Sequence, residues 1–226
     1  MERKSFVLVH GAWHGGWCWR RVSDILAGKG HRVFTPTLTG LGERSHLIAD
    51  TVNLTTHITD IVNLLRWEEL ENILLCGHSY GGMVVTGAAD RAAGRIASLV
   101  FLDAFVPENG QSLREVTTRP LPQTATIPVV PAAAFMVNEK DRAWVDRQCT
   151  PHPAASMNEK ISLTGAWRGI KRKTYIRAGA YPSTSFDSAL QRFQTDPGWT
   201  TTSVPCGHDV MVDMPEQLAE LLEASL

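Results

Sequence analysis

The sequence predicts an α/β fold with a mostly parallel sheet and helices on both faces. The first observation is a series of short apolar runs, beginning with Phe6-Val7-Leu8-Val9, that do not alternate with polar residues. Such runs are typical of strands buried on both faces of a parallel sheet. The second observation is that segments with helical periodicity separate these runs. Because this alternation favours crossover helices over one sheet, we expect the active site at the carboxyl ends of the strands.

The first half of the chain contains three strand–helix units and a fourth strand. Gly28 and Gly30 end the first helix, and Pro36 stops the second strand. The second helix is amphipathic, because its apolar residues recur at helical spacing. The expected strands are Phe6–Val9, His31–Thr35, Asn72–Cys76 and Ile96–Leu102, and the expected helices are Trp19–Ala27, Thr55–Trp67 and Ser79–Ala93.

The alternation stops between Pro107 and about Arg172, where prolines cluster and no strand pattern is clear. Two helix-like pieces lie in this part, at Ala132–Phe135 and Lys140–Arg147. A strand, a helix, a strand and a helix then follow, at Lys173–Arg177, Ser185–Thr195, Trp199–Val204 and Pro215–Leu222. A chain of 226 residues fits one domain. We therefore expect a single domain over 1–226, with an insertion at about 107–172 that serves as a lid or binding element.

Composition argues against several classes of function. The formal net charge is -1 and no basic patch is present, so we expect no nucleic-acid partner. No apolar run approaches the ~20 residues of a membrane span, and no signal-peptide core follows the N-terminus. We therefore expect a cytoplasmic protein that does not enter a membrane. The four cysteines form no C-x-x-C pair, which argues against a metal site; they are Cys18, Cys76, Cys149 and Cys206.

Residues 77–81, Gly-His-Ser-Tyr-Gly, match the G-x-S-x-G motif of a nucleophilic serine. The motif needs a sharp turn between a strand and a helix, so that the serine hydroxyl stands clear of the sheet. Small residues at its two ends let the neighbouring backbone pack closely. A pentapeptide match alone arises easily by chance. Here an apolar run precedes the motif and a helical segment follows it, which favours Ser79 as a nucleophile over a structural turn.

The glycine-rich loop after the first strand, 10–16, is the expected source of an oxyanion hole. In this kind of fold one backbone amide comes from that loop and the other from the residue after the nucleophile. These positions are Ala12 and Tyr80. The alternative is a glycine-rich turn with no role in catalysis. A dinucleotide-binding loop is not expected, because G-x-G-x-x-G is absent.

His208 is the expected general base. It follows the last strand, and this late position fits the Ser…Asp…His order of such triads. It would take the proton of the serine and later pass it to the leaving group. Other histidines, among them His10, His14 and His78, lie in the motif loops, where they line the site or brace the backbone.

The third member of the triad has two candidates. Asp103 directly follows the apolar strand Ile96–Leu102, and a carboxylate at the end of a buried strand needs a partner such as the His208 imidazole. Asp187 comes several residues after the strand Lys173–Arg177, in an expected helix. We favour Asp103, with a purely structural role for its carboxylate and a catalytic role for Asp187 as the alternatives.

The expected pocket combines the loops with the insertion. Trp13, His14 and His78 come from the loops, whereas Phe135 and Trp144 come from the insertion. For each apolar residue of the insertion, packing of a lid onto the core is an equally good explanation. A pocket of this composition suits a substrate with an apolar acyl or alkyl part.

These motifs resemble the plant methylesterase and hydroxynitrile lyase branch of the α/β-hydrolase superfamily and its bacterial esterase relatives. The similarity covers Phe6 to about Pro107 and resumes at Gly207. It rests on Phe-Val-Leu-Val-His-Gly-Ala-Trp-His-Gly-Gly-Trp at 6–17, on Gly-His-Ser-Tyr-Gly-Gly-Met at 77–83 and on Phe-Leu-Asp-Ala-Phe-Val-Pro at 101–107. The resemblance implies an α/β-hydrolase fold with a Ser-His-Asp triad, no cofactor, and a cap over an apolar pocket.

Two departures from the family pattern narrow the expected activity. Hydroxynitrile lyases of this type carry a threonine after the first motif histidine and a lysine after the catalytic histidine. This chain has Gly11 and Asp209 there, which argues against cyanohydrin cleavage. The plant methylesterases place their acid after the later strand, where this chain has Tyr181 and its neighbours. The choice of Asp103 therefore rests on its own argument and not on the resemblance.

We therefore expect a carboxylesterase-type serine hydrolase that cleaves a small ester through an acyl-enzyme, without a metal or cofactor. The same triad would also serve a lactonase, a thioesterase, an acyltransferase or a carbon–carbon hydrolase. A further alternative is a non-catalytic homologue that uses the pocket as a receptor. A small-molecule ester is the expected partner, and the sequence leaves a homodimer open.

Overall fold

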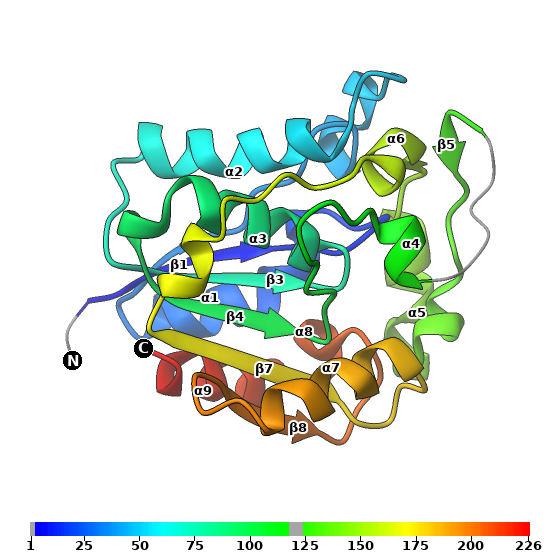
Figure 1. The fold of residues 1–226 in the computed structure, drawn as a ribbon. Coiled ribbons are helices and arrows are strands. Elements are labelled where there is room, and N and C mark those ends of the chain that lie inside the picture. Colours follow the sequence, from blue (N-terminus) through cyan, green and yellow to red (C-terminus); the bar gives the residue numbers. More distant parts are fainter. Residues whose placement is uncertain (1–2, 118–123) are drawn as a thin grey trace.

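A computed structural model describes residues 3–117 and 124–226, in which six parallel strands form one sheet (Figure 1). The strand order is β2-β1-β3-β4-β7-β8, and every neighbouring pair runs parallel. The predicted fold class is confirmed. The strands are β1 (Ser5–Val9), β2 (Arg32–Phe34), β3 (Ile73–His78), β4 (Ile96–Leu102), β7 (Arg172–Ala178) and β8 (Thr200–Val204).

Both faces of the sheet are covered by helices. Val7 and Val9 of β1 belong to one apolar cluster, whereas Phe6 and Leu8 belong to a second. The first cluster includes residues of α2 (Leu54–Trp67), α3 (Gly81–Arg91) and α7 (Thr184–Gln194); the second includes residues of α1 (Arg20–Gly28), α8 (Val210–Asp213) and α9 (Pro215–Ala224). The longest helix, α2, has 14 residues, and none within 3–117 or 124–226 is long and apolar enough to cross a membrane.

The predicted elements outside the insertion are present, with small shifts at their ends. One shift is at the start of α3, which begins at Gly81 because Ser79 adopts a left-handed backbone conformation, with φ of 53°. Two 3-10 turns, Gly16–Trp19 and Gly42–Leu47, occupy parts that were expected to be irregular or α-helical. Short turns of this kind have no periodic sequence signal.

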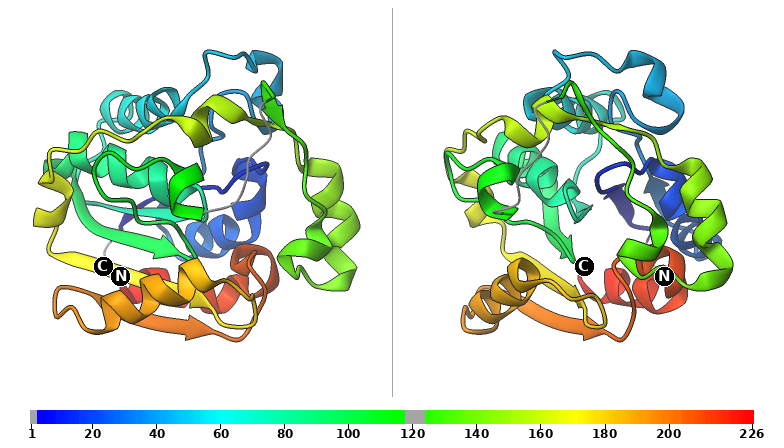
Figure 2. Two further views of the ribbon diagram at one scale, coloured as in Figure 1. Left: turned by 45° about the vertical axis from the view of Figure 1, so that its right-hand side comes forward. Right: turned by 90° about the vertical axis from the view of Figure 1, so that its right-hand side faces the viewer.

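The described chain between β4 and β7 consists of short elements, most of which lie beyond the carboxyl ends of the strands (Figures 1 and 2). The last of them, a 3-10 turn, instead lies beside α3 at the amino end of β7. The elements are α4 (Leu113–Thr117), β5 (Thr126–Ile127), a 3-10 turn Ala132–Phe135, α5 (Glu139–Gln148), β6 (His152–Pro153), α6 (Ala154–Asn158) and a 3-10 turn Ala166–Gly169. The antiparallel pair β5–β6 was not predicted, because two-residue strands are too short to show an alternating pattern. Pro120 and Pro122 lie outside the described residues.

The turn after β3 leaves no room for a side chain at Gly77. A Cβ built there would lie 2.6 Å from the Gly81 carbonyl oxygen and 2.6 Å from Val85 Cγ2. The first of these atoms is backbone, so the helix itself would have to move.

Gly77→Ala should lower the free energy of unfolding by about 1–3 kcal/mol, the usual cost of overpacking. The measurement is a urea unfolding curve beside that of Gly28→Ala. A Cβ at Gly28 would meet nothing within 4 Å, so that change should be neutral or slightly stabilising. Equal midpoints for the two variants would contradict this account of the turn.

Candidate active site

Ser79, Asp103 and His208 lie at the carboxyl edge of the sheet, as the sequence analysis expected. Ser79 follows β3, Asp103 follows β4, and His208 lies between β8 and α8. Backbone contacts connect the first two turns, because the Ser79 amide donates to the Leu102 carbonyl oxygen (3.2 Å) and the Ser79 carbonyl accepts from the Phe105 amide (3.2 Å). The turns that carry the serine and the carboxylate are therefore one hydrogen-bonded unit.

Ser79 is the half-buried residue at the tip of a strained turn. Its φ of 53° costs free energy for a residue with a side chain, and such strain is often found at functional positions. Its neighbours His78 and Tyr80 are buried, whereas Ser79 is partly exposed. The close packing of Gly77 against Gly81 makes this turn sharp. The geometry matches that of a nucleophile presented above a sheet.

Asp103 is the carboxylate that contacts His208. Its Oδ2 lies 2.6 Å from His208 Nδ1, and both residues are buried. Its Oδ1 accepts hydrogen bonds from Arg177 Nη1 (2.8 Å) and from the Ala178 amide (3.1 Å). Asp187, the alternative acid, instead lies with its Oδ1 3.0 Å from Arg177 Nε, and 55% of its side chain is exposed.

Aromatic rings pack against the His208 ring, and hydrogen bonds hold the His208 backbone. Tyr181 and Phe186 stack with it at centroid distances of 4.6 Å and 5.4 Å. The His208 amide donates to the Phe135 carbonyl (2.9 Å), and its carbonyl accepts from His78 Nε2 (3.0 Å). Burial, followed by the nearby His208, holds the pKa of His78 well below its usual range, so His78 is a neutral brace. Within the described chain, no hydrogen bond joins the Ser79 hydroxyl to the His208 ring.

The loop after β1 reaches the serine with two unused amides nearby. A Cβ built at Gly11 would lie 2.9 Å from Ser79 Cβ, so the loop passes directly against the turn that carries Ser79. In the described parts of the chain, neither the Ala12 amide nor the Tyr80 amide donates to a protein acceptor. His14 fixes the loop from the other side, because its Nδ1 lies 2.8 Å from the Ala12 carbonyl oxygen.

His14 and Asp209 form a second buried histidine–carboxylate pair beside the first. His14 Nε2 lies 2.9 Å from Asp209 Oδ2, and both side chains are almost completely buried. Since both ring nitrogens of His14 face acceptors, the protonated imidazole satisfies both contacts. Burial alone would lower the pKa of His14, but the Asp209 carboxylate raises it. Burial opposes ionisation of Asp209 as well, yet His14 holds the pKa of that carboxyl down at about 2.

Of the expected pocket residues, Trp13, His14, His78 and Phe135 gather near His208, whereas Trp144 does not. Phe135 packs against Trp13 (5.7 Å between centroids), His14 (5.9 Å) and His208 (5.9 Å). Trp144 packs against Trp17 (5.1 Å) and Arg21 (5.4 Å), on the far side of His14. A bidentate Arg21–Asp141 pair anchors α5, and Trp144 of this helix lies beside the same arginine.

Several residues at the site were not singled out from the sequence. His152 of β6 accepts the Trp13 amide (3.3 Å) and packs against Tyr80 (4.8 Å). Arg177 is the buried cation of β7, a strand that also contains Arg172 and Lys173, so no pattern in the sequence marked it as the one that is buried and requires a partner. Tyr181 had no signal either, since its stacking depends on where a loop folds.

Two other features lie apart from this cluster. A surface hollow of about 700 Å³ is lined by residues that include Trp17, Arg20 and Arg147, and none of the three triad candidates contributes to it. Among the residues that the structure describes, no group of three or more His, Cys, Asp or Glu side chains is placed to hold a metal ion. The cluster around Ser79 is therefore the site on which we base a function.

Comparison with known proteins identifies the family. The family model "Alpha/beta hydrolase family" matches residues 6–221. A carbendazim hydrolyzing esterase from Nocardioides sp. (strain SG-4G) is 44% identical, with 97% of this chain and 98% of that protein covered. Methylesterase 1 of Arabidopsis thaliana is 34% identical, with 72% of this chain and 56% of that protein covered.

The fold agrees with the sequence comparison. The structure of an extracellular α/β-hydrolase from a Paenibacillus species superposes with a TM-score of 0.83, at 23% identity and with 98% of each chain covered. Taken with the match over residues 6–221, this shows that the chain belongs to the α/β-hydrolase family of hydrolytic enzymes, on the branch that includes plant methylesterases and bacterial esterases.

Proposed function

We propose that this enzyme hydrolyses a small carboxylic ester through an acyl-enzyme on Ser79. The observation that carries the proposal is the buried 2.6 Å contact between Asp103 and His208, directly beside the strained serine turn. A carboxylate, an imidazole and a hydroxyl in this order form the catalytic triad that activates a serine nucleophile. The 44% identical relative is a named esterase, which supports the same reaction class.

Acylation begins when His208 Nε2 accepts the proton of the Ser79 hydroxyl. The serine oxygen attacks the ester carbonyl carbon, and the resulting tetrahedral oxyanion is held by the Ala12 and Tyr80 amides. The bond from carbon to the alcohol oxygen then breaks, and His208 passes its proton to the departing alcohol. The Ser79–His208 hydrogen bond forms with substrate bound, as catalytic contacts often tighten only in the complex.

Deacylation repeats these steps with water as the nucleophile. His208 takes one proton from a water molecule, and the water oxygen attacks the acyl carbonyl carbon. The bond to the serine oxygen then breaks, and His208 returns the proton to Ser79, which releases the carboxylic acid. Asp103 holds the His208 Nδ1–H tautomer and balances the imidazolium that forms in each half-reaction. No cofactor enters this scheme.

We further propose that the segment 107–172 is the lid of a single hydrolase domain. Its backbone reaches the loop after β1, because the Thr150 amide donates to the Trp13 carbonyl (2.9 Å). Its Phe135 packs beside Trp13 and His208, so the lid supplies an apolar ring close to the proposed general base. Pockets with such a lining bind ligands through an apolar part. The cytoplasmic location and the homodimer stay predictions from the sequence alone.

Carbendazim is a second candidate substrate, because it stands in the name of the 44% identical relative. Lactones, thioesters and carbon–carbon substrates use the same triad chemistry, so a panel of substrates distinguishes them. Tight ligand binding without turnover would instead indicate a receptor.

The ester proposal predicts turnover of short and medium p-nitrophenyl esters by the wild-type enzyme. Ser79→Ala should lower kcat by about 10⁶-fold, because it removes the nucleophile. Asp103→Asn should lower it by about 10⁴-fold, because it favours the wrong His208 tautomer. Asp187→Asn should cost less than about tenfold, since its exposed carboxylate does not touch the imidazole.

Arg192→Gln is the matched control, because it removes a charge from α7 in a half-exposed pair with Glu108 (3.3 Å). A collapse of Asp187→Asn with an active Asp103→Asn would move the acid to Asp187. Absence of turnover on esters and carbendazim would refute the proposed reaction.

The His14–Asp209 pair should make stability depend on pH. The raised pKa of His14 means that its contribution is complete below 6.5 and is lost as the pH rises through the folded value. The lowered pKa of Asp209 means that its contribution is complete above 3.8 and is lost as the pH falls toward 2. The pair therefore stabilises the fold most between these two ordinary values.

Asp209→Asn should accordingly cost about 3 kcal/mol at pH 5, because it leaves a buried imidazolium without its partner. The cost should shrink in more alkaline buffer, as measured by urea unfolding at a series of pH values. Glu223→Gln, which alters the more exposed His31–Glu223 pair (3.1 Å), should cost less than about 1 kcal/mol throughout. A pH-independent loss for Asp209→Asn would rule out the ion pair.

A further inference from the structure

The proposed triad acid has an unusual neighbour, a fully engaged buried arginine. Arg177 Nη1 lies 2.8 Å from Asp103 Oδ1, and only 3% of the Arg177 side chain is exposed. A carboxylate that serves a catalytic histidine needs no cation for that task, and an adjacent cation weakens its attraction for an imidazolium. This buried pair therefore requires its own explanation.

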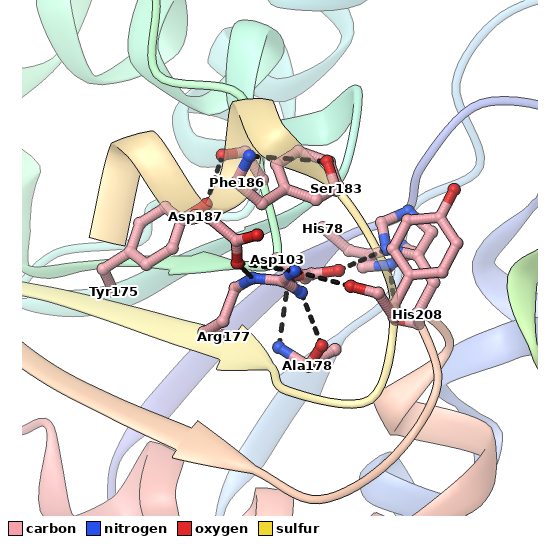
Figure 3. A network of polar contacts seen from close by, with 11 residues as sticks. His78, Asp103, Tyr175, Arg177, Ala178, Ser183, Phe186, Asp187 and His208 are labelled. Carbon is pink, nitrogen blue, oxygen red and sulfur yellow. Dashed lines mark hydrogen bonds and ion pairs between the residues drawn. The ribbon is translucent and has the colours of Figure 1, made fainter. Parts of the chain in front are cut away.

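The guanidinium uses its fixed fork to hold four groups at once (Figure 3). Nη1 donates to Asp103 Oδ1 and to the Ala178 carbonyl, Nη2 donates to the Tyr181 carbonyl, and Nε donates to Asp187 Oδ1 (3.0 Å). Nη2 also lies 2.9 Å from that same Asp187 oxygen. No ammonium group reproduces this planar set of contacts.

These contacts determine where the Asp103 carboxylate points. Its Oδ1 is occupied by Arg177 Nη1 and the Ala178 amide, so its Oδ2 is the oxygen that faces His208. The same guanidinium fixes the backbone of Tyr181, whose ring stacks on the His208 imidazole at 4.6 Å. Arg177 therefore contacts both the carboxylate and the loop that orient the histidine.

The charges form an alternating row that ends in solvent. Asp103 is completely buried, Arg177 lies between the two carboxylates, and Asp187 is 55% exposed. Burial would lower the pKa of Arg177, but Asp103 and Asp187 raise it, so the arginine stays charged. In a medium of low dielectric constant each charge acts on the next across several ångströms.

We propose that Arg177 is a positioning residue, which aims Asp103 at His208 and offsets part of its charge, while Asp187 balances Arg177 from the surface. The expected effect of Arg177 on catalysis rests on the ester hydrolysis proposed above, whereas its expected effect on the titration of His208 does not. Asp187 thus acts on the acid through Arg177 and is not an acid of the triad itself.

The test is the titration of the His208 imidazole by NMR, with its signal identified by its loss in His208→Gln. Arg177→Gln removes a cation and should raise the titration midpoint by about 1 pH unit. Asp187→Asn removes an anion, is more exposed, and should lower the midpoint by about 0.3 unit. Arg177→Lys should keep the midpoint near that of the wild type, because it keeps the charge.

Other ionisable groups around His208 are unchanged in these variants. They are Asp103, His78, Asp209, His14, Tyr181 and Cys206. Arg192→Gln removes an equal charge from α7 without contact to Asp103, so its midpoint should stay within about 0.1 unit of the wild type. Opposite shifts for Arg177→Gln and Asp187→Asn are a signature that a merely structural role would not produce.

Activity gives the second readout. Arg177→Gln should lower kcat on p-nitrophenyl esters by about 10²-fold, because the carboxylate loses its fixed orientation. Arg177→Lys should recover only part of that loss in kcat, while its His208 titration midpoint stays near that of the wild type. The two measurements together separate the effect of geometry from the effect of charge. If Arg177→Gln does not fold, Asp187→Asn and Arg177→Lys still decide the question.

Midpoints that are identical in all variants, or that shift in one direction, would overturn the proposal. The titration does not depend on turnover. A wild-type protein that cleaves no ester would refute the proposed reaction while the opposite shifts still supported the role of Arg177. Normal ester turnover with unshifted midpoints would support the proposed reaction and refute the role of Arg177.

Discussion

A carboxylate buried at the end of a strand is the constraint on which the rest of the site depends. Asp103 has no access to solvent, so protein groups must supply its donors. Those donors come from β7, through Arg177 and Ala178, and from the turn after β8, through His208. The Asp103 side chain therefore connects the end of β4 with the end of β7 and with the turn after β8. Its left-handed backbone, with φ of 43°, shows that the turn is held against a local conformational cost.

The loop after β1 is tied to the same edge by a second polar pair. His14 connects the Ala12 carbonyl with Asp209, the residue next to His208. The loop that offers the unused Ala12 amide is thus braced against the part of the chain that carries the imidazole. Both ring nitrogens of His14 have partners, whereas Asp209 Oδ1 is buried without one among the described residues. The satisfied histidine contacts favour a loop that is preorganised before a ligand binds.

Sequence patterns were sufficient for the sheet, for the serine turn and for the choice of Asp103 as the carboxylate beside His208. Continuous apolar strands and glycines at fixed offsets are local signals, which can be recognised in a single sequence. Trp144 and the β5–β6 pair were missed or misplaced, since short segments without periodicity take their positions from tertiary contacts. Arg177 is one of three cationic residues in β7, and its carboxylate partners are 74 and 10 residues away along the chain, so its burial did not follow from the strand pattern.

The position of the carboxylate directly after β4 also changes what the turn after β7 has to supply. In this chain that turn contributes a ring, Tyr181, and backbone carbonyls to the surroundings of His208, and no carboxylate. Backbone groups are common to all residues, and a ring can be exchanged for another flat side chain. Side chains in this turn can therefore be exchanged while the Asp103–His208 contact stays intact, but its length is constrained, because Arg177 binds a backbone carbonyl of the turn.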